Sequence, residues 1–367
     1  MKISYRLNGQ DYYVHFLEKS YNQISKDLDK LNSDKKILFV YDNNISKNII
    51  NNIFSTLKFT GCNVYKLQYI GSKKNKNLKS VLKIIDLLIK EGFTKKSVIL
   101  SLGGGVLSDL SGLAASLYMR GMLYFNIPST MTAMIDSCIG GKTAVNYQNI
   151  INSIGTYHHA KNVYILQDLI NCLPDREFYS GIPEIIKCGL IKKNQILKIL
   201  EKKHLQVKKR ESKIIKKLCL ETLRTKIFFF KNDVYEKNKR LMLNFGHTFA
   251  HSIEMATAKL NSKNELFRHG EAVGIGMLCE LNYALNSNSK ISKKTKELLE
   301  LYKLPVNLKS LTLNKSMLQN DIFKNLFLDK KKVSKYPRYI NIKKIGSPKI
   351  LEMKDYNKIN FIIRDIL

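Results

Sequence analysis

The sequence has little of what disulfide-bonded or membrane-spanning proteins contain. Six cysteines occur in 367 residues, and no two of them stand in a Cys-x-x-Cys arrangement. They fall inside apolar segments, so we expect free, buried thiols in a reducing compartment rather than a disulfide framework. No apolar run approaches the roughly 20 residues that span a bilayer, and the first residues lack a signal-peptide pattern. We therefore expect a cytoplasmic protein with no membrane partner.

Acidic residues are also scarce, because 30 Asp and Glu accompany 62 Lys and Arg, which gives a formal net charge of +32. A basic field of this size attracts phosphate polymers, so nucleic-acid binding is one interpretation. The lysines, however, are spread over distant runs at residues 73–79, 202–217 and 329–335, mixed with Asn and Ile. That distribution is typical of a sequence enriched throughout in Lys, Asn and Ile, and not of one basic binding patch. We therefore expect no nucleic-acid partner.

The chain is long enough for two domains, and 44% of its residues are hydrophobic. Its first part alternates short apolar strands with amphipathic helices, which predicts a mainly parallel sheet covered on both faces. A hairpin is expected at residues 2–17, a helix at 78–91, and strands at 35–42, 63–69, 97–102, 122–128 and 162–167. From about residue 175 helical periodicity dominates, with a short hairpin near residues 338–346. The expected domains are residues 1–174 and 175–367.

Two glycine clusters punctuate the first part. Residues 103–112, GGGVLSDLSG, join a strand to a helix, where the backbone can approach a diphosphate at the helix N-terminus. A tight turn without a ligand is the alternative, because the spacing is not G-x-G-x-x-G. The second cluster, Gly-Gly-Lys-Thr, resembles the end of a P-loop, but Asp136 stands where the first glycine of that motif would fall. We expect a flexible loop that presents Lys142 to an anion.

The second part contains a candidate metal site. His247 and His251 stand four residues apart and share one helix face. His269 begins another apolar helix, and Glu184 lies in an apolar segment where an unpaired carboxylate is costly to bury. A cation would offset that cost. From spacing alone, hydrogen-bonded core histidines remain the alternative.

These segments, taken in order, resemble the 3-dehydroquinate synthases over nearly the full chain: GGGVLSDLSG, YMRG, DSCIGGKTAVN, LPDREF, SGIPEIIK, LNFGHTFAH and RHGEAV. The resemblance implies a Rossmann-like α/β domain followed by a mainly helical one. It implies a homodimeric lyase of the shikimate pathway that uses NAD and zinc, with cobalt as an alternative. The sugar-phosphate substrate would be 3-deoxy-D-arabino-heptulosonate 7-phosphate, and the products 3-dehydroquinate and phosphate. Another sugar-phosphate cyclase and a metal-dependent polyol dehydrogenase remain alternatives.

The resemblance also assigns residues. It implies Glu184, His247 and His269 as metal ligands, with His251 near the substrate phosphate instead of the metal. It implies substrate-binding and catalytic residues at Arg120, Asp136, Lys142, Asn152, Lys187, Lys226, Arg240, Asn244, His251 and the segment 329–331. It implies cofactor contacts at Asp42, Asn44, Gly71, Ser72, Lys73, Lys76, Gly104, Gly105, Val106, Leu107, Ser108, Asp109, Ser129, Thr130, Lys142, Ile151, Leu169, Ile170, Asn171 and Cys172, with Glu177 as a support or, alternatively, a helix N-terminal acid.

Three positions depart from the family pattern near the cofactor. Lys73 stands where relatives carry a glutamate, Ile151 where a lysine is expected, and Ser108 replaces a glycine. We predict weakened NAD binding with the chemistry retained, because every metal and elimination residue persists.

Overall fold

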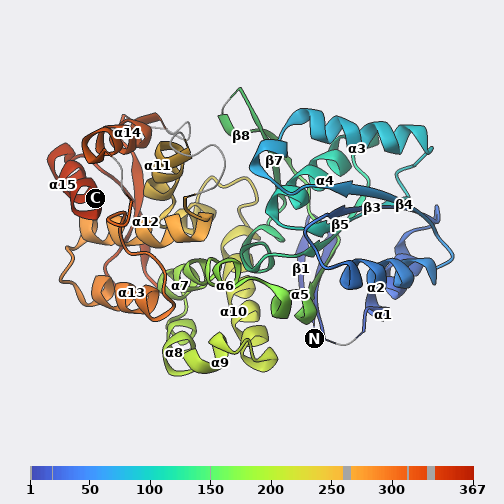
Figure 1. The fold of residues 1–367 in the computed structure, drawn as a ribbon, viewed down its shortest axis with the longest axis horizontal. Coiled ribbons are helices and arrows are strands. Elements are labelled where there is room, and N and C mark those ends of the chain that lie inside the picture. Colours follow the sequence, from blue (N-terminus) through green and yellow to red (C-terminus); the bar gives the residue numbers. More distant parts are fainter. Residues whose placement is uncertain (1, 19, 149, 259–265, 312–313, 329–334) are drawn as a thin grey trace. The chain divides into compact units, whose positions relative to one another are not determined.

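In the computed structural model, the chain divides into two compact units, Met1–Pro174 and Asp175–Leu367. The structure describes residues 2–18, 20–148, 150–258, 266–311, 314–328 and 335–367 (Figure 1). The cation-rich segment at residues 329–331 therefore lies outside the described residues.

The first unit is built on a seven-stranded sheet with the order β1-β2-β9-β6-β5-β3-β4. Its strands are β1 (Lys2–Leu7), β2 (Gln10–Leu17), β3 (Lys36–Asp42), β4 (Asn63–Tyr69), β5 (Val98–Gly103), β6 (Leu123–Pro128) and β9 (Asn162–Leu166). All neighbouring strands are parallel except β1 and β2, which form the predicted hairpin. The prediction of a mainly parallel sheet is confirmed.

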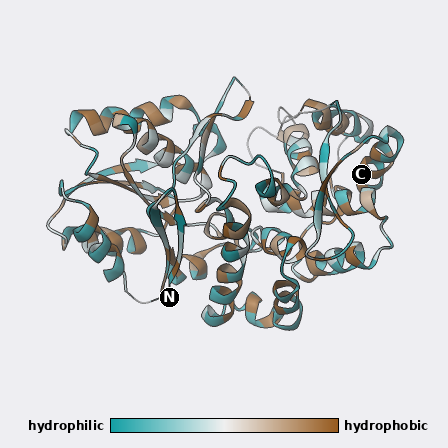
Figure 2. Ribbon diagram, turned by 180° about the vertical axis from the view of Figure 1, so that it is seen from behind, coloured by the Kyte–Doolittle hydropathy of each residue, from teal (hydrophilic) through white to brown (hydrophobic). Residues whose placement is uncertain are grey.

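Helices cover both faces of this sheet. Figure 1 shows α1 (Asn22–Leu31) and α2 (Lys47–Lys58) on one face, and α3 (Leu78–Lys90) and α4 (Gly105–Leu117) on the other. Apolar and polar residues alternate around these helices (Figure 2), and the apolar ones are buried against the strands. Strands β5 and β9 are buried along their whole length, as expected for strands covered on both faces. The unit also contains η1 (Lys73–Asn75), η2 (Tyr118–Arg120) and α5 (Gln167–Cys172).

The strand order reverses between β3 and β5. From β3 the chain adds β4 on one side and then returns to place β5 on the other side. Ligands of open α/β sheets bind at the carboxyl ends of strands at such a reversal, because the connecting loops diverge there and leave a crevice. Asp42 ends β3 and Gly103 ends β5, so the predicted diphosphate turn lies at this position.

The expectation of a flexible loop around Lys142 is wrong. A short helical turn, η3 (Ala133–Ser137), leads into β7 (Lys142–Tyr147), which pairs with β8 (Ile150–Tyr157) in an antiparallel hairpin. Thr143 and Val145 alternate on the buried side of β7, and this side packs on α4. The contact is possible because Gly112 lacks a side chain, since a Cβ there would lie 2.5 Å from Thr143 Cγ2.

The cysteine prediction holds with one correction. All six cysteines are free, and five of them are buried. Cys172 is the last residue of α5 and follows the exposed Asn171. It lies beyond the buried residues Leu169 and Ile170, and its side chain is exposed.

The second unit is mainly helical, as predicted. Its elements are α6 (Asp175–Tyr179), α7 (Ile182–Ile191), α8 (Asn194–Lys202), α9 (His204–Lys208), α10 (Ser212–Phe230), η4 (Lys239–Asn244), α11 (His247–Ala258), α12 (His269–Ala284), α13 (Lys290–Leu301), α14 (Lys315–Leu328), β10 (Arg338–Ile342), β11 (Pro348–Glu352) and α15 (Tyr356–Ile366). The hairpin near residue 338 is confirmed, although its second strand starts later than expected. None of the described helices is long and apolar enough to cross a membrane.

Helix α12 is the centre of this unit, because it packs on α7, α11 and β10. Close approach between α12 and the turn before α11 depends on two glycines. Gly246 has φ +83°, a left-handed conformation that L side chains rarely adopt, and a Cβ on Gly276 would lie 2.0 Å from the Gly246 carbonyl oxygen. These contacts fix where α11 begins, and His247 is its first residue.

Candidate functional site

Three helix starts converge in the second unit and bring together one carboxylate and two imidazoles. Glu184 lies in the first turn of α7, while His247 and His269 are the first residues of α11 and α12. Helix α7 is buried throughout, which forces Glu184 inward. Because α12 packs on both other helices, residues that are far apart in the sequence meet at one point.

The geometry of the three side chains fits a divalent metal ion. Glu184 Oε1 lies 3.5 Å from His247 Nε2 and 3.7 Å from His269 Nε2, and one donor atom from each residue lies within 4.8 Å of the others. Ligands at about 2.0–2.1 Å in a tetrahedron stand roughly 3.4 Å apart, so small movements would complete such a site. No other group of three His, Cys, Asp or Glu within the described ranges meets the same criterion.

The second nitrogen of each imidazole has a partner that suits this role. His247 Nδ1 lies 3.2 Å from the Phe245 carbonyl oxygen, and His269 Nδ1 lies 3.3 Å from Glu254 Oε2. An N–H donated to either acceptor leaves the lone pair on Nε2, which faces Glu184. Histidine ligands of metals are commonly held in this way by a carbonyl or a carboxylate.

The local charges also favour a neutral imidazole. Burial lowers the pKa of His247 well below its usual value, and the positive Lys187 and the neighbouring His269 and His251 lower it further. Glu184 is 1% exposed and forms an ion pair with the buried Lys187. The site therefore holds a buried carboxylate, a buried cation and the neutral imidazole of His247.

His251 lies beside the three donors without belonging to the group. Its ring centroid is 5.5 Å from that of His247 and 6.2 Å from that of His269. Spacing alone would pair His247 and His251 as ligands. The tertiary packing selects His269 instead, because the start of α12 faces Glu184.

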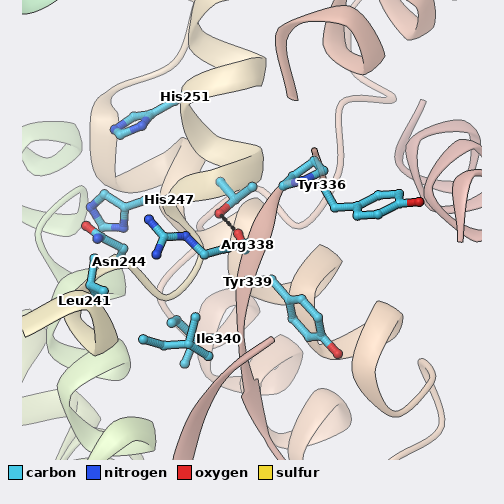
Figure 3. Close-up of a pocket in the computed structure, with 11 residues that line it drawn as sticks. Leu241, Asn244, His247, His251, Tyr336, Arg338, Tyr339 and Ile340 are labelled. Carbon is cyan, nitrogen blue, oxygen red and sulfur yellow. Dashed lines mark hydrogen bonds between the residues drawn. The ribbon is translucent and has the colours of Figure 1, made fainter. Parts of the chain in front are cut away.

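A cavity opens next to His247. It is lined by Leu241, Asn244, His247, Thr248, His251, Tyr336, Pro337, Arg338, Tyr339, Ile340 and Ile350. Figure 3 shows the Arg338 side chain entering the cavity from β10, directed toward His247 and Asn244. The sequence analysis missed Arg338, which is one of 62 basic residues and belongs to none of the motifs.

The other basic residues expected in the second unit are buried, so they are not solvated surface charges. Lys187, Lys226 and Arg240 are 1%, 6% and 1% exposed. Arg240 Nη1 donates to the Val234 carbonyl oxygen at 2.6 Å. Asn244 Nδ2 donates to Glu236 Oε1 at 2.8 Å. Burying a charge is costly unless it is paired, and Lys187 is paired with Glu184.

Glu280, which the sequence analysis also missed, connects the turn before α11 to strand β10. This fully buried carboxylate of α12 accepts hydrogen bonds from Gly246 N through Oε1 and from Ile340 N through Oε2, each 2.9 Å long. It therefore joins the turn before His247 to strand β10. The only signal in the sequence was an acidic residue within an apolar helix.

Glu280 leads to a prediction about stability and pH. Burial raises the pKa of Glu280 to about 8, although the hydrogen bonds from Ile340 and Gly246 and the charge of Lys187 act against this rise. Between about pH 4.5 and 8 the folded protein keeps a proton that the unfolded chain releases. Its stability should therefore fall as pH rises through that window, by up to about 1.4 kcal/mol per pH unit.

The measurement compares urea unfolding of the wild type and Glu280→Gln from pH 5 to pH 9. We expect the stability advantage of the wild type to shrink as the pH approaches 8 and to level off above it. Parallel stability curves for the two proteins would contradict the prediction.

In the first unit, several expected cofactor residues gather at the ends of β3 and β5. The Asp42 carboxylate accepts from Asn44 N and Nδ2 at 3.0 and 3.1 Å. Ser129, which follows β6, donates its backbone N–H to the Gly103 carbonyl oxygen at 2.9 Å. Three adjacent strands thus present the segments 42–44, 103–109 and 129–130 at one edge of the sheet.

Lys76 connects this edge to the β7–β8 hairpin. Its Nζ lies 2.5 Å from Asp109 Oδ2 and 2.6 Å from Asn152 Oδ1. Gly71 and Ser72 lie between β4 and η1, and Lys73 is the first residue of η1, which ends just before Lys76. Lys142 begins β7 and is exposed, as are Asn152 and Ile151 on β8.

Four more of the expected residues are Ser108, Arg120, Asp136 and Glu177. The Ser108 hydroxyl donates to Asn126 Oδ1 at 3.1 Å, so this departure from the family pattern faces the sheet. Arg120 is exposed in a left-handed conformation with φ +63°, and Asp136 lies in η3. Glu177 forms a 2.6 Å ion pair with Arg268 at the start of α12, a structural role that the sequence analysis did not foresee.

Comparisons of the sequence with known proteins find relatives over most of the chain. The family model described as 3-dehydroquinate synthase N-terminal matches residues 67–180, and the one described as 3-dehydroquinate synthase C-terminal matches residues 181–332. The 3-dehydroquinate synthase of Clostridium acetobutylicum is 32% identical over 349 residues, covering 92% of each chain. That of Pelagibacter ubique is 33% identical over 353 residues, covering 95% of this chain and 94% of the relative.

Solved structures share the fold. A 2-deoxy-scyllo-inosose synthase complexed with carbaglucose-6-phosphate, NAD+ and Co2+ matches over the full length of both chains, with a TM-score of 0.87 and 22% identity. A 2-epi-5-epi-valiolone synthase from Streptomyces hygroscopicus, with NAD+ and Zn2+ bound, matches 99% of this chain and 98% of its own, with a TM-score of 0.83 and 23% identity.

Proposed function

This chain belongs to the 3-dehydroquinate synthase family, and we propose that it converts 3-deoxy-D-arabino-heptulosonate 7-phosphate to 3-dehydroquinate and phosphate. The observation that carries the proposal is the convergence of Glu184, His247 and His269 beside a cavity whose lining includes Asn244, His251 and Arg338. Such an enzyme acts in the shikimate pathway, on the route to chorismate and the aromatic amino acids. It is a lyase that uses NAD and a divalent metal.

We assign the metal and the cofactor to different units. Glu184, His247 and His269 would hold zinc, because two nitrogens and one carboxylate leave a tetrahedral position open for substrate. Cobalt is the alternative. Residues 1–174 would bind NAD along the ends of β3 and β5, with the diphosphate at the start of α4, where backbone N–H groups point outward. When bound, the metal supplies Lewis acidity and NAD supplies reversible hydride transfer.

The residues of the chain would bind and orient the substrate. The buried cations Lys187, Lys226 and Arg240 can neutralise its carboxylate and phosphate groups in a site that excludes water. Lys187 also holds Glu184 in place through their ion pair. Remaining substrate contacts are proposed at Arg120, Asp136, Lys142, Asn152, Asn244 and His251.

We further propose a cytoplasmic homodimer. The six free cysteines suit a reducing compartment. Leu117, Met119 and Tyr157 are exposed apolar residues near the exposed Arg120, and Met119 and Arg120 both have positive φ. This surface would be covered by a second copy, so that Arg120 reaches the partner's site. Light scattering of the purified protein should give twice the chain mass, and a monomer at assay concentrations would refute the dimer.

One assay separates the proposed function from its alternatives. The enzyme should release phosphate from the heptulosonate substrate with catalytic NAD and no added reductant. A different sugar-phosphate cyclase would act on a substrate such as glucose 6-phosphate instead. A polyol dehydrogenase would reduce NAD in proportion to polyol and release no phosphate.

The departures at Lys73 and Ile151 lead to a prediction about NAD affinity. A glutamate at residue 73 could accept hydrogen bonds from ribose hydroxyls, and a lysine at residue 151 could bind the diphosphate. Each restored charged hydrogen bond should tighten binding by roughly 10- to 150-fold, in line with a net contribution of roughly 1.5–3 kcal/mol. We expect Lys73→Glu and Ile151→Lys to lower the Kd for NAD in a calorimetric titration.

The matched control is Lys74→Glu, which makes the same change of charge within the same short helix η1. It should leave the NAD Kd nearly unchanged. If Lys73→Glu and Lys74→Glu behave alike, the charge at residue 73 does not limit NAD binding.

A further inference from the structure

We infer that Arg338 is a further substrate-binding residue of this site and that it contacts the substrate phosphate, an inference that rests on the proposed function. Its side chain enters the cavity from the first position of β10 and points toward His247 and Asn244 (Figure 3). His247 is a proposed metal ligand, so the guanidinium lies next to the reacting part of the site. The residue is half-buried, which leaves it accessible from the cavity.

The backbone of Arg338 is fixed to the helix turn that carries His247. Thr248 Oγ1 donates to the Arg338 carbonyl oxygen at 2.7 Å. Two residues further on, Ile340 N donates to Glu280, which also accepts from Gly246 N. Both contacts connect β10 to the start of α11. They therefore fix the position of the Arg338 backbone relative to His247. An arginine that only covered the surface would need no such support.

The chemistry of the cavity lining selects the ligand. Asn244 and His251 line the side of the cavity toward which the Arg338 guanidinium points, whereas the hydroxyls of Tyr336 and Tyr339 point away from it (Figure 3), and none of the lining residues is acidic. A cation surrounded by such groups suits an oxyanion. A phosphate has three terminal oxygens, so it can use the guanidinium fork and a neighbouring donor together. A carboxylate is already satisfied by the fork alone, and phosphate therefore fits this lining better.

The test uses the metal- and NAD-loaded enzyme with Arg338→Gln and Arg338→Lys. Inorganic phosphate, the proposed product, is the binding probe in calorimetry, and steady-state kinetics give KM and kcat for the substrate. We expect Arg338→Gln to weaken phosphate binding and to raise KM by roughly 10- to 100-fold, since a charged bidentate contact is lost. Arg338→Lys keeps the positive charge but lacks the guanidinium fork. Its phosphate affinity and its KM should lie between those of the wild type and those of Arg338→Gln. Metal content should not change.

The matched control is Arg364→Gln, which makes the same change of charge at an exposed residue of α15 outside the cavity lining. It should bind phosphate as the wild type does. Equal phosphate affinity in Arg338→Gln, Arg364→Gln and the wild type overturns the inference, as does wild-type protein that binds no phosphate. A raised KM with unchanged phosphate binding overturns the phosphate assignment.

Two further outcomes remain decidable. If Arg338→Gln does not fold, judged by its thermal melting curve, Arg338→Lys must still bind phosphate several-fold more weakly than the wild type, or the inference fails. If the wild type does not turn over the heptulosonate, the proposed function is lost. Calorimetry with inorganic phosphate then still reports on Arg338, because it needs no turnover.

Discussion

Removal of the metal with a chelator should abolish phosphate release, and one equivalent of a divalent cation should restore it. The reason is the composition of the site. Glu184, His247 and His269 present one oxygen and two nitrogens to a common point, and a metal held there would supply Lewis acidity to the substrate. We expect zinc and cobalt to restore turnover, and magnesium to fail because it prefers oxygen ligands.

Variants of the three donors should lose the metal itself. Glu184→Gln and His269→Ala each remove one metal ligand. Mutation of a residue that only hydrogen-bonds to a ligand already weakens metal affinity about 10- to 100-fold, so loss of a ligand itself should weaken it by more than about 100-fold. Glu254→Gln tests that outer contact, because Glu254 lies against His269 Nδ1. Competition with a chromophoric chelator measures each affinity.

His204→Gln is the control, because His204 lies on α9 and belongs to no donor group. It should keep both the metal and the activity. His251→Gln should keep the metal but lose rate, since His251 lines the cavity without being one of the three donors. A full complement of tightly bound metal in Glu184→Gln would refute the proposed centre.

Lys187→Met should destabilise the metal-free protein by about 3–5 kcal/mol, the cost of removing one partner from a buried ion pair. Lys187 and Glu184 are 2% and 1% exposed, so the carboxylate that is left behind cannot turn to water. The loss should be smaller in the metal-loaded protein, because the cation then neutralises Glu184. Urea unfolding with and without a chelator measures both values.

A double variant and a control sharpen this test. Glu184→Gln added to Lys187→Met removes the stranded charge and should recover part of the lost stability. Lys193→Met breaks the partly exposed pair with Glu221 and should cost no more than about 1 kcal/mol. Equal losses in Lys187→Met and Lys193→Met would show that the buried pair has no special role.

Much of the fold could be read from local patterns. Apolar runs separated by helical periodicity predicted the strands β3, β4, β5, β6 and β9 and the parallel sheet, and the hairpin expected at residues 2–17 is β1 and β2. These signals are local, because the alternation of buried and exposed side chains repeats within a few residues. The β7–β8 hairpin was missed because β8 is largely exposed, and because the buried side of β7 depends on a glycine of α4 that is distant in sequence.

Some residues of the site could be predicted from local sequence patterns and others could not. Glu184, His247 and His269 stood out because each is a polar residue inside an apolar segment. Arg338 did not, since a single arginine in a chain with 62 basic residues carries no local signal. Glu280 likewise acquires its role from two backbone N–H groups, one preceding it and one following it by many residues.

The sequence by itself determined the order of strands and helices, the family, and the types of side chain available for chemistry. The family resemblance already implied His269 rather than His251 as the third donor, which spacing alone did not, and the tertiary structure brings His269 together with Glu184 and His247. The tertiary structure alone decided that Arg338 enters the cavity next to His247. The physical reason is that helical periodicity specifies which face a residue occupies, whereas convergence depends on how α7, α11, α12 and β10 pack. That packing depends on glycine contacts and buried hydrogen bonds between segments far apart in the chain.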